Sequence, residues 1–264
     1  METRQKVVLP FDPGTPSIAR VWDYWLGGKD NFAVDRELAQ KMLQINPLAA
    51  RMARENRQFL GRAVAYVAER GIRQFVDVGA GLPTALNTHD IALRADPAAK
   101  VVYIDNDPMV IAHARALLAT THDVIVVPGD VRDPGAILAD PLLTRLIDLA
   151  EPVCVLLSGV LHFIDAAQAR DVASTFTRAI APGSYVIISV GTGEDDVATP
   201  FRAAYTAASL YIHSPDQVRT FFDGLELVPP GLVPARGWEG GGQRKRLSAR
   251  RPTFLAGVGC KKRA

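Results

Sequence analysis

The feature that most constrains the fold is a series of five short apolar segments, each separated from the next by a stretch of helical character. A strand that is apolar on both faces must be buried on both sides, and the intervening helices can cover those faces. This alternation predicts an α/β fold with a mostly parallel central sheet. The strands are expected at residues 74–78, 101–104, 124–127, 153–157 and 185–190, and the helices near residues 84–95, 108–119, 134–149 and 166–180.

The C-terminal part of the chain departs from this alternation. Two apolar segments, Leu225 to Val228 and Phe254 to Val258, have no clear helix between them, so we expect an antiparallel pair at one edge of the sheet. The segment from Gly237 to Arg251 is rich in glycine and basic residues, which predicts an exposed hairpin loop. Its basic run, QRKRLSARR, contains no aromatic residue on which a base could stack. A solvated surface is therefore favoured over a nucleic-acid site.

Three helices are predicted ahead of the first strand. Pro16-Ser17 is a typical start signal, and the apolar residues from Ile18 to Trp25 follow the i, i+3, i+4, i+7 spacing of a helix face. Gly27-Gly28 is expected to end this helix. Further helices are expected at residues 33–44 and 48–70. Because these helices have no place in the sheet, we expect an N-terminal helical cap, residues 1–71, and a sheet domain, residues 72–264.

Glycines and carboxylates directly follow the first three strands, at the edge where open α/β sheets bind their ligands. Gly79 and Gly81 allow a sharp turn and close approach of a ligand, although two glycines after a strand are often only a tight turn. Asp105 is placed to accept hydrogen bonds from ribose hydroxyls. The alternative is a cap for the next helix, a role that Asp107 fills better. Asp130 can accept from an adenine amine, and the alternative is a loop aspartate held by backbone amides.

Together these strand ends resemble those of the class I S-adenosylmethionine-dependent methyltransferases, over residues 72–264. In that family the glycine loop faces the methionine part of the cofactor, the second-strand acid holds the ribose, and the third-strand acid holds the adenine amine. The resemblance implies a Rossmann-like sheet with a reversed last strand, S-adenosylmethionine as cofactor, S-adenosylhomocysteine as product, and no metal. Pro83 stands where many members have another glycine, so backbone approach near the methionine end is expected to be less close. Cofactor contacts are expected from Asp77, Gly79, Ala80, Gly81, Asp105, Asn106, Asp130, Val131, Ser158 and Gly159.

Four blocks narrow this resemblance: PSIARVWDYWLGGKDNFAVDRE, ENRQFLGRAV, DVGAGLPTALNTHDIA and SGVLHFI. Together they span almost the whole chain, and they are similar to a group of uncharacterised actinobacterial-type S-adenosyl methyltransferases. The likeness implies the fold and the cofactor but not the substrate. We expect a small-molecule methyl acceptor.

Methyl transfer from a sulfonium is an in-line displacement, so alignment and desolvation can supply much of the catalysis. A base is needed only where the acceptor loses a proton. Ser158 and His162 follow the fourth strand and could face the cleft. His162 is a candidate base, although a hydrogen-bonded wall of the pocket is slightly favoured. Tyr205 lies in the insertion after the fifth strand, where core packing is the favoured role. Arg57, with its polar neighbours on the third helix, is expected on a solvated surface rather than across the cleft.

The stretch RVWDYWLGGKDNF, residues 20–32, is predicted to close over the strand ends as a lid. Trp22 and Trp25 belong to the apolar stripe and are expected to pack against the body of the protein. Tyr24 lies off that stripe, so it is expected to face the cleft and is a third catalytic candidate. The double glycine would let Asn31 approach the cofactor or the acceptor.

The overall charge and composition narrow the functions that the chain could have. The formal net charge of +2 gives no reason to favour nucleic acid or an anionic membrane. The start of the chain has no apolar signal segment, and a cytoplasmic location is expected. Monomer and dimer both stay open. Two rival functions stay open as well: a non-catalytic protein that binds the cofactor on the same fold, and, more weakly, a nicotinamide-dependent oxidoreductase. Thr84 argues against the latter, because it replaces the third glycine of the dinucleotide fingerprint.

Overall fold

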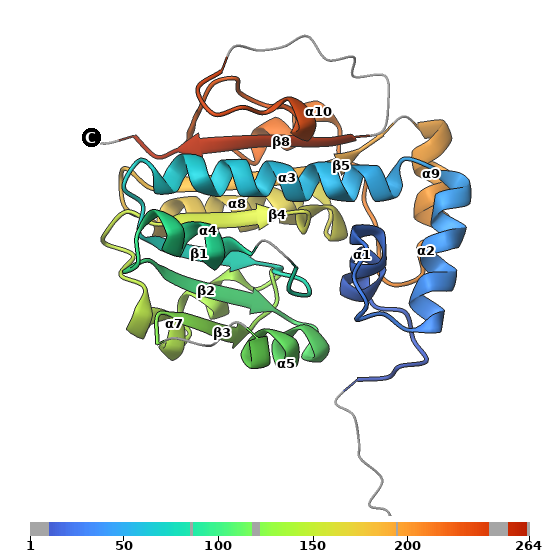
Figure 1. Cartoon of the computed structure of the whole chain (residues 1–264). Coiled ribbons are helices and arrows are strands. Elements are labelled where there is room, and N and C mark those ends of the chain that lie inside the picture. The colour runs from blue at the N-terminus through green and yellow to red at the C-terminus, as the bar shows by residue number, and fades with distance from the viewer. Residues whose placement is uncertain (1–10, 85–86, 118–121, 194, 243–252, 263–264) are drawn as a thin grey trace, which may run out of the picture.

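The computed structural model describes residues 11–84, 87–117, 122–193, 195–242 and 253–262 (Figure 1). Its centre is one sheet with the strand order β3-β2-β1-β4-β5-β8-β6, and β7 pairs with β8. The strands are β1 Gln74–Val78, β2 Lys100–Asp105, β3 Val124–Pro128, β4 Cys154–Ser158, β5 Tyr185–Thr192, β6 Glu226–Leu227, β7 Val233–Pro234 and β8 Thr253–Cys260. The helices are α1 Ile18–Leu26, α2 Ala33–Ile45, α3 Ala49–Ala68, α4 Thr88–Ala95, α5 Pro108–Leu117, α6 Pro134–Leu138, α7 Pro141–Leu146, α8 Ala166–Ala179, α9 Asp195–Ala204 and α10 Pro215–Thr220, with 3-10 turns η1 Leu161–Phe163 and η2 Ala235–Gly237.

The predicted sheet is confirmed. Strands β1 to β5 pair in parallel, whereas β8 runs antiparallel to β5 and pairs with the short β6 at the edge. The long connections between parallel neighbours are the helices that the apolar pattern requires. In Figure 1 the arrows of β1, β2, β3 and β4 run toward the side on which α1 lies, and β5 is parallel to β4, so the carboxyl ends of these strands face the N-terminal helices.

Alternate residues of the strands enter two separate cores. Phe75 and Val101 belong to the core under α3 and α4, which lie in front of the sheet in Figure 1. Val76 and Val102 belong to the core under α6, α7, α8 and α10. This two-residue alternation is the period of a β-strand, and it explains why the strands are apolar throughout.

The N-terminal helices form a third core. Val21, Trp25, Leu38 and Met42 pack there with the first turns of α3. A buried ion pair supports this packing, because Nε of Arg20 donates to Oδ2 of Asp35 at 2.7 Å. The later residues of α3 belong to the sheet core instead, so α3 connects the helical layer to the sheet.

Two local expectations are wrong. Residues 134–149 form two short helices rather than one, because Asp140 caps α7 by accepting from the backbone N–H of Leu142 at 2.8 Å, and Pro141 begins the new helix. The segment that starts at Gly237 is not an exposed loop at its beginning, since Trp238 is fully buried. The basic run at residues 243–251 lies outside the described residues. Within the described ranges, no helix is both long and apolar enough to cross a bilayer.

Candidate cofactor site

A cavity of about 790 Å³ lies at the carboxyl ends of β1, β2, β3 and β4, and we call it the strand-end cavity. Its volume falls in the range of roughly 300–1,000 Å³ that is typical of small-molecule sites. Every residue expected to contact the cofactor, except Asn31, lines it. They are Asp77, Gly79, Ala80, Gly81, Asp105, Asn106, Asp130, Val131, Ser158 and Gly159.

The two glycines after β1 have different reasons to lack a side chain. Gly79 has φ +74°, and a Cβ there would lie 2.7 Å from Cγ2 of Val160, so a larger residue does not fit. Gly81 has φ +67°, but a Cβ there would meet no atom within 4 Å. Because Gly81 lines the strand-end cavity, its missing side chain leaves open space for a ligand close to the backbone.

Asp105 at the end of β2 holds its carboxylate in a fixed position. Its Oδ2 accepts from the N–H of Gly81 at 2.9 Å, and its Oδ1 accepts from the N–H of Asp107 at 3.0 Å. Burial raises the pKa of Asp105 to about 6, although both backbone bonds oppose the rise. A carboxylate has about four lone-pair sites, so Asp105 keeps the capacity to accept from a ligand hydroxyl.

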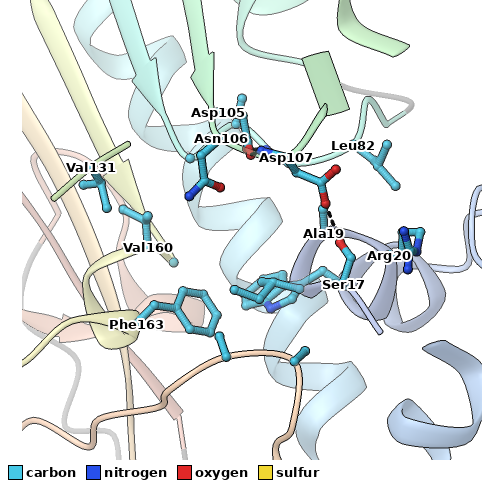
Figure 2. Close-up of a pocket in the computed structure, with 18 of the residues that line it drawn as sticks. Ser17, Ala19, Arg20, Leu82, Asp105, Asn106, Asp107, Val131, Val160 and Phe163 are labelled. Carbon is cyan, nitrogen blue, oxygen red and sulfur yellow. Dashed lines mark hydrogen bonds between the residues drawn. The ribbon is translucent and has the colours of Figure 1, made fainter. Parts of the chain in front are cut away.

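The carboxylate of Asp130, after β3, already accepts hydrogen bonds from neighbouring side chains. Nε of Arg132 donates to its Oδ1 at 2.9 Å, and Nδ2 of Asn106 donates to its Oδ2 at 3.2 Å. The hydrogen bonds from Arg132 lower the pKa of Asp130 to about 2, so this carboxylate stays ionised. Figure 2 shows Val131 at the border of the same cavity, where it offers an apolar surface beside this polar group.

Asp77 and two residues of α3 form the polar floor. Asp77 is buried and its Oδ2 accepts from the hydroxyl of Thr88 at 2.6 Å. Burial raises the pKa of Asp77, and Arg57 opposes the rise. Arg57 and Asn56 both line the strand-end cavity, so the expectation of a solvated surface is wrong for these two, because this end of α3 faces the strand ends. Oδ1 of Asn56 is buried with no hydrogen-bond partner among the residues described, which makes it available to a ligand donor.

The N-terminal segment supplies a wall of the cavity, as the lid hypothesis requires. Ser17, Trp22 and Asp23 line it. The hydroxyl of Ser17 donates to Oδ2 of Asp107 at 2.5 Å, which fastens the start of α1 to the loop after β2 (Figure 2). Trp22 reaches the other side, since a Cβ on Gly159 would lie 3.3 Å from Cη2 of Trp22.

The double glycine has a specific role that the sequence did not indicate. The turn after α1 folds around the carboxylate of Asp23, whose Oδ2 accepts from the N–H of Asp30 at 2.9 Å and from Nδ2 of Asn31 at 2.7 Å. A Cβ on Gly28 would lie only 1.8 Å from Oδ1 of Asp23, so a larger residue would displace this carboxylate from the turn. The expected approach of Asn31 to the cofactor is therefore not seen, because its side chain is used to hold Asp23.

Tyr24 does not face the cavity, and this expectation is wrong. Its hydroxyl accepts from Nε2 of Gln40 on α2 at 3.2 Å, and it is not among the residues that line the cavity. Trp22, Asp23 and Leu26 line it instead. Around the helix axis Leu26 lies between Trp22 and Asp23, whereas Tyr24 lies about 160° from both Trp22 and Leu26.

The two catalytic candidates that follow β4 lie in different cavities. Ser158 lines the strand-end cavity, with its Oγ 2.9 Å from Oγ of Ser189. His162 is buried and lines a second, smaller cavity, where its ring stacks on Trp22 at 6.4 Å between centroids. Burial lowers the pKa of His162 to about 3, with His213 contributing, so the imidazole is neutral. His162 therefore forms a wall of the second cavity and not of the strand-end cavity.

Asp23 and Asp107 also line the strand-end cavity, although the sequence patterns do not mark them as site candidates. Asp107 comes two positions after Asp105, a spacing that could have indicated its presence at the same edge. In the part of the chain that the structure describes, no group of three or more His, Cys, Asp or Glu side chains could hold a metal ion.

Comparison with known proteins places this site in a family. The sequence profile described as "S-adenosyl methyltransferase" matches residues 5–262. The chain is 38% identical to a candidate methyltransferase from Thermobifida fusca YX, with a TM-score of 0.87 over 95% of this chain and 96% of the other. It is 32% identical to a DUF574 family protein from Streptomyces avermitilis MA-4680, with a TM-score of 0.86 over 94% and 98%.

Similarity to more distant solved structures supports the fold alone. The N-methyltransferase NodS from Bradyrhizobium japonicum, in complex with S-adenosylhomocysteine, is 15% identical, with a TM-score of 0.50 over 92% of this chain and 100% of the other. No curated protein matches the chain. The profile match over nearly the whole sequence and the two similar structures, together with the strand-end cavity, show that the chain belongs to the S-adenosyl methyltransferase family.

Proposed function

We propose that the chain binds S-adenosylmethionine in the strand-end cavity and transfers its methyl group to a small-molecule acceptor, releasing S-adenosylhomocysteine. The observation that carries this proposal is the convergence of Gly81, Asp105 and Asp130, from three neighbouring strand ends, on one cavity. The cavity is of the size of a small-molecule site, which favours a small acceptor over a macromolecule.

The charges around the cavity fit this cofactor. Six aspartates and three arginines are among the described residues that line it, so acidic groups outnumber basic ones, as suits a cationic ligand. When bound, S-adenosylmethionine would supply a methyl group on a positively charged sulfur, and the acceptor would take this methyl group as the carbon–sulfur bond breaks and the sulfur leaves as the thioether of S-adenosylhomocysteine. The chain's residues would orient that group: Asp105 would accept from the ribose, Asp130 and Val131 would meet the adenine, and Gly81 would leave room for the methionine part.

The N-terminal segment would exclude water from the reacting atoms. Ser17 and Trp22 cover opposite parts of the cavity, and removing water strengthens every electrostatic contact inside. On this view residues 1–71 cap a methyltransferase domain of residues 72–264. Of the three catalytic candidates only Ser158 lines the cavity. Alignment and desolvation, rather than an assigned base, are therefore the proposed source of catalysis.

The test is transfer of a labelled methyl group from S-adenosylmethionine to a small-molecule fraction of cell extract. We expect label to enter a small molecule with wild-type protein. Asp105→Ala should bind the cofactor more weakly by roughly 1–3 kcal/mol, the scale of lost hydrogen bonds to a buried polar group. Asp123→Ala is a matched control, because Asp123 precedes β3 at the opposite end of the sheet. Calorimetric binding of the cofactor without any transfer would contradict the proposed activity and favour a binding protein.

A further inference from the structure

A second cavity, of about 80 Å³, lies beside the strand-end cavity and shares two of its walls. Trp22 and Phe163 line both cavities. The second one is larger than a water site, which needs roughly 10–15 Å³, and has about half the volume of a dry cavity of about 150 Å³ that accepts benzene. It can therefore enclose only part of a six-membered ring, and the rest of the ring would lie against the shared walls, Trp22 and Phe163. We call it the apolar pocket. Its other walls include Trp25, Met52, Phe201, Tyr205, Leu210 and Phe254.

The apolar pocket carries no charge at neutral pH in the part of the chain that is described. No Asp, Glu, Lys or Arg is among the described residues that line it. His162 lines it as a neutral ring, because burial lowers the pKa of this residue to about 3. Transfer of a charged group into such surroundings is costly, so the apolar pocket selects a neutral group.

The hydroxyl oxygen of Tyr205 is a polar atom in the apolar pocket that needs a hydrogen-bond partner. Its ring stacks on Phe163 at 6.2 Å and on Phe201 at 6.3 Å between centroids. Its hydroxyl is buried and has no hydrogen-bond partner among the described residues. Burial raises the pKa of Tyr205, so the hydroxyl keeps its proton. A buried hydroxyl without a partner is destabilising by itself, and a ligand with an oxygen or nitrogen atom would remove that penalty.

We propose that the apolar pocket holds one end of the methyl acceptor. The acceptor is then a small molecule whose bound end is neutral and apolar, no larger than a six-membered ring, with a hydroxyl or carbonyl group that meets the hydroxyl of Tyr205. This inference rests on the proposed methyl transfer. The rest of the acceptor would pass Trp22 and Phe163 into the strand-end cavity, where Trp22 lies against Gly159. Trp22 would thus lie between the end of the acceptor held in the apolar pocket and the end that receives the methyl group.

Phenol is the ligand used to probe the apolar pocket. Benzene, which lacks the hydroxyl, and benzoate, which carries a charge, are the comparison compounds. Of the methionines in the described residues, only Met52 lines the apolar pocket, so a protein labelled at its methionine methyl groups reports binding there by NMR. We expect phenol to move the Met52 signal saturably and benzoate to leave it unmoved. Tyr205→Phe should weaken phenol binding roughly 2- to 12-fold, the loss of one neutral hydrogen bond, and leave benzene binding unchanged. Tyr24→Phe is the matched control, because it removes a hydroxyl that lies outside both cavities.

Two further measurements separate this inference from the proposed function. Phenol should inhibit methyl transfer to the extract acceptor competitively and leave the calorimetric affinity for S-adenosylmethionine unchanged. An unmoved Met52 signal, or equal phenol binding by wild type and Tyr205→Phe, would overturn the apolar pocket as a ligand site. Phenol binding at Met52 without inhibition of transfer would overturn its assignment to the acceptor. Failure of the cofactor to bind would instead refute the proposed function and leave the phenol result standing.

Discussion

Replacing Gly81 by alanine separates the ligand role of the glycine loop from its structural role. Gly81 has φ +67°, and alanine in this region costs roughly 1–2 kcal/mol of stability. A Cβ at this position meets no protein atom within 4 Å, so no steric clash adds to that cost. The new methyl group would instead occupy space in the strand-end cavity that Gly81 lines.

Gly71→Ala provides the matched control. Gly71 has φ +89° and also has no atom within 4 Å of a Cβ, but it is exposed, it precedes β1 at the amino end, and it does not line the cavity. Both variants should therefore lose about 1–2 kcal/mol in urea unfolding. Only Gly81→Ala should lose cofactor affinity, by about 1.4 kcal/mol or more, which is tenfold.

The assay is calorimetric titration with S-adenosylmethionine at a temperature where both variants are folded. Equal affinities of Gly81→Ala and Gly71→Ala would refute the reasoning, since the added methyl group would then not meet the ligand. A much larger loss of stability in Gly81→Ala than in Gly71→Ala would show that the space beside Gly81 is filled by the protein itself.

Three other predictions concern the groups around the cavity. Burial raises the pKa of Asp105 to about 6, and ribose hydroxyls favour its ionised form. Cofactor affinity should therefore be nearly constant above about pH 7, fall about twofold at pH 6 and fall about tenfold by pH 5; a flat calorimetric profile from pH 7.5 to 5 would contradict the contact. Asp35→Asn leaves the guanidinium of Arg20 buried without its carboxylate partner. The free energy of unfolding in urea should therefore fall by about 3–5 kcal/mol, and a change below 1 kcal/mol would contradict a stabilising role of this ion pair. Ser17→Ala removes the hydrogen bond to Asp107 and should speed cofactor dissociation about fivefold, roughly 1 kcal/mol, in stopped-flow measurements; an unchanged rate would show that this contact does not hold the N-terminal wall closed.

The sheet and its ligand-binding edge were predictable because they depend on local patterns. A run such as Val101 to Ile104 is apolar on both faces, as expected of a strand that is covered on both sides. The residue after each strand then falls at the sheet edge by geometry alone. Asp105 and Asp130 could be placed at one site without knowledge of any tertiary contact.

The orientation of α1 could not be predicted in the same way. The apolar stripe identifies the side that packs on other helices, and Trp25 does lie there. Trp22 belongs to the same stripe but lies at its border, where it contacts both the cores and the cavity. The distinction between Trp22 and Tyr24 depends on where α2 lies, because Gln40 binds the hydroxyl of Tyr24.

The apolar pocket was also beyond the reach of the sequence. Its walls come from residues as distant along the chain as Trp22, Phe163 and Phe254, and no spacing rule connects them. From the sequence, Tyr205 is expected to pack in the core, and its ring does stack on Phe163 and Phe201. The unpartnered hydroxyl becomes visible only once its surroundings are known.

The central claim is that the ends of β1, β2 and β3 bind S-adenosylmethionine, and calorimetric titration of the wild-type protein tests it most directly. We predict saturable heat with one cofactor molecule per chain at sub-millimolar concentration, and competition by S-adenosylhomocysteine for the same site. Folded protein that releases no heat with either compound would contradict the claim.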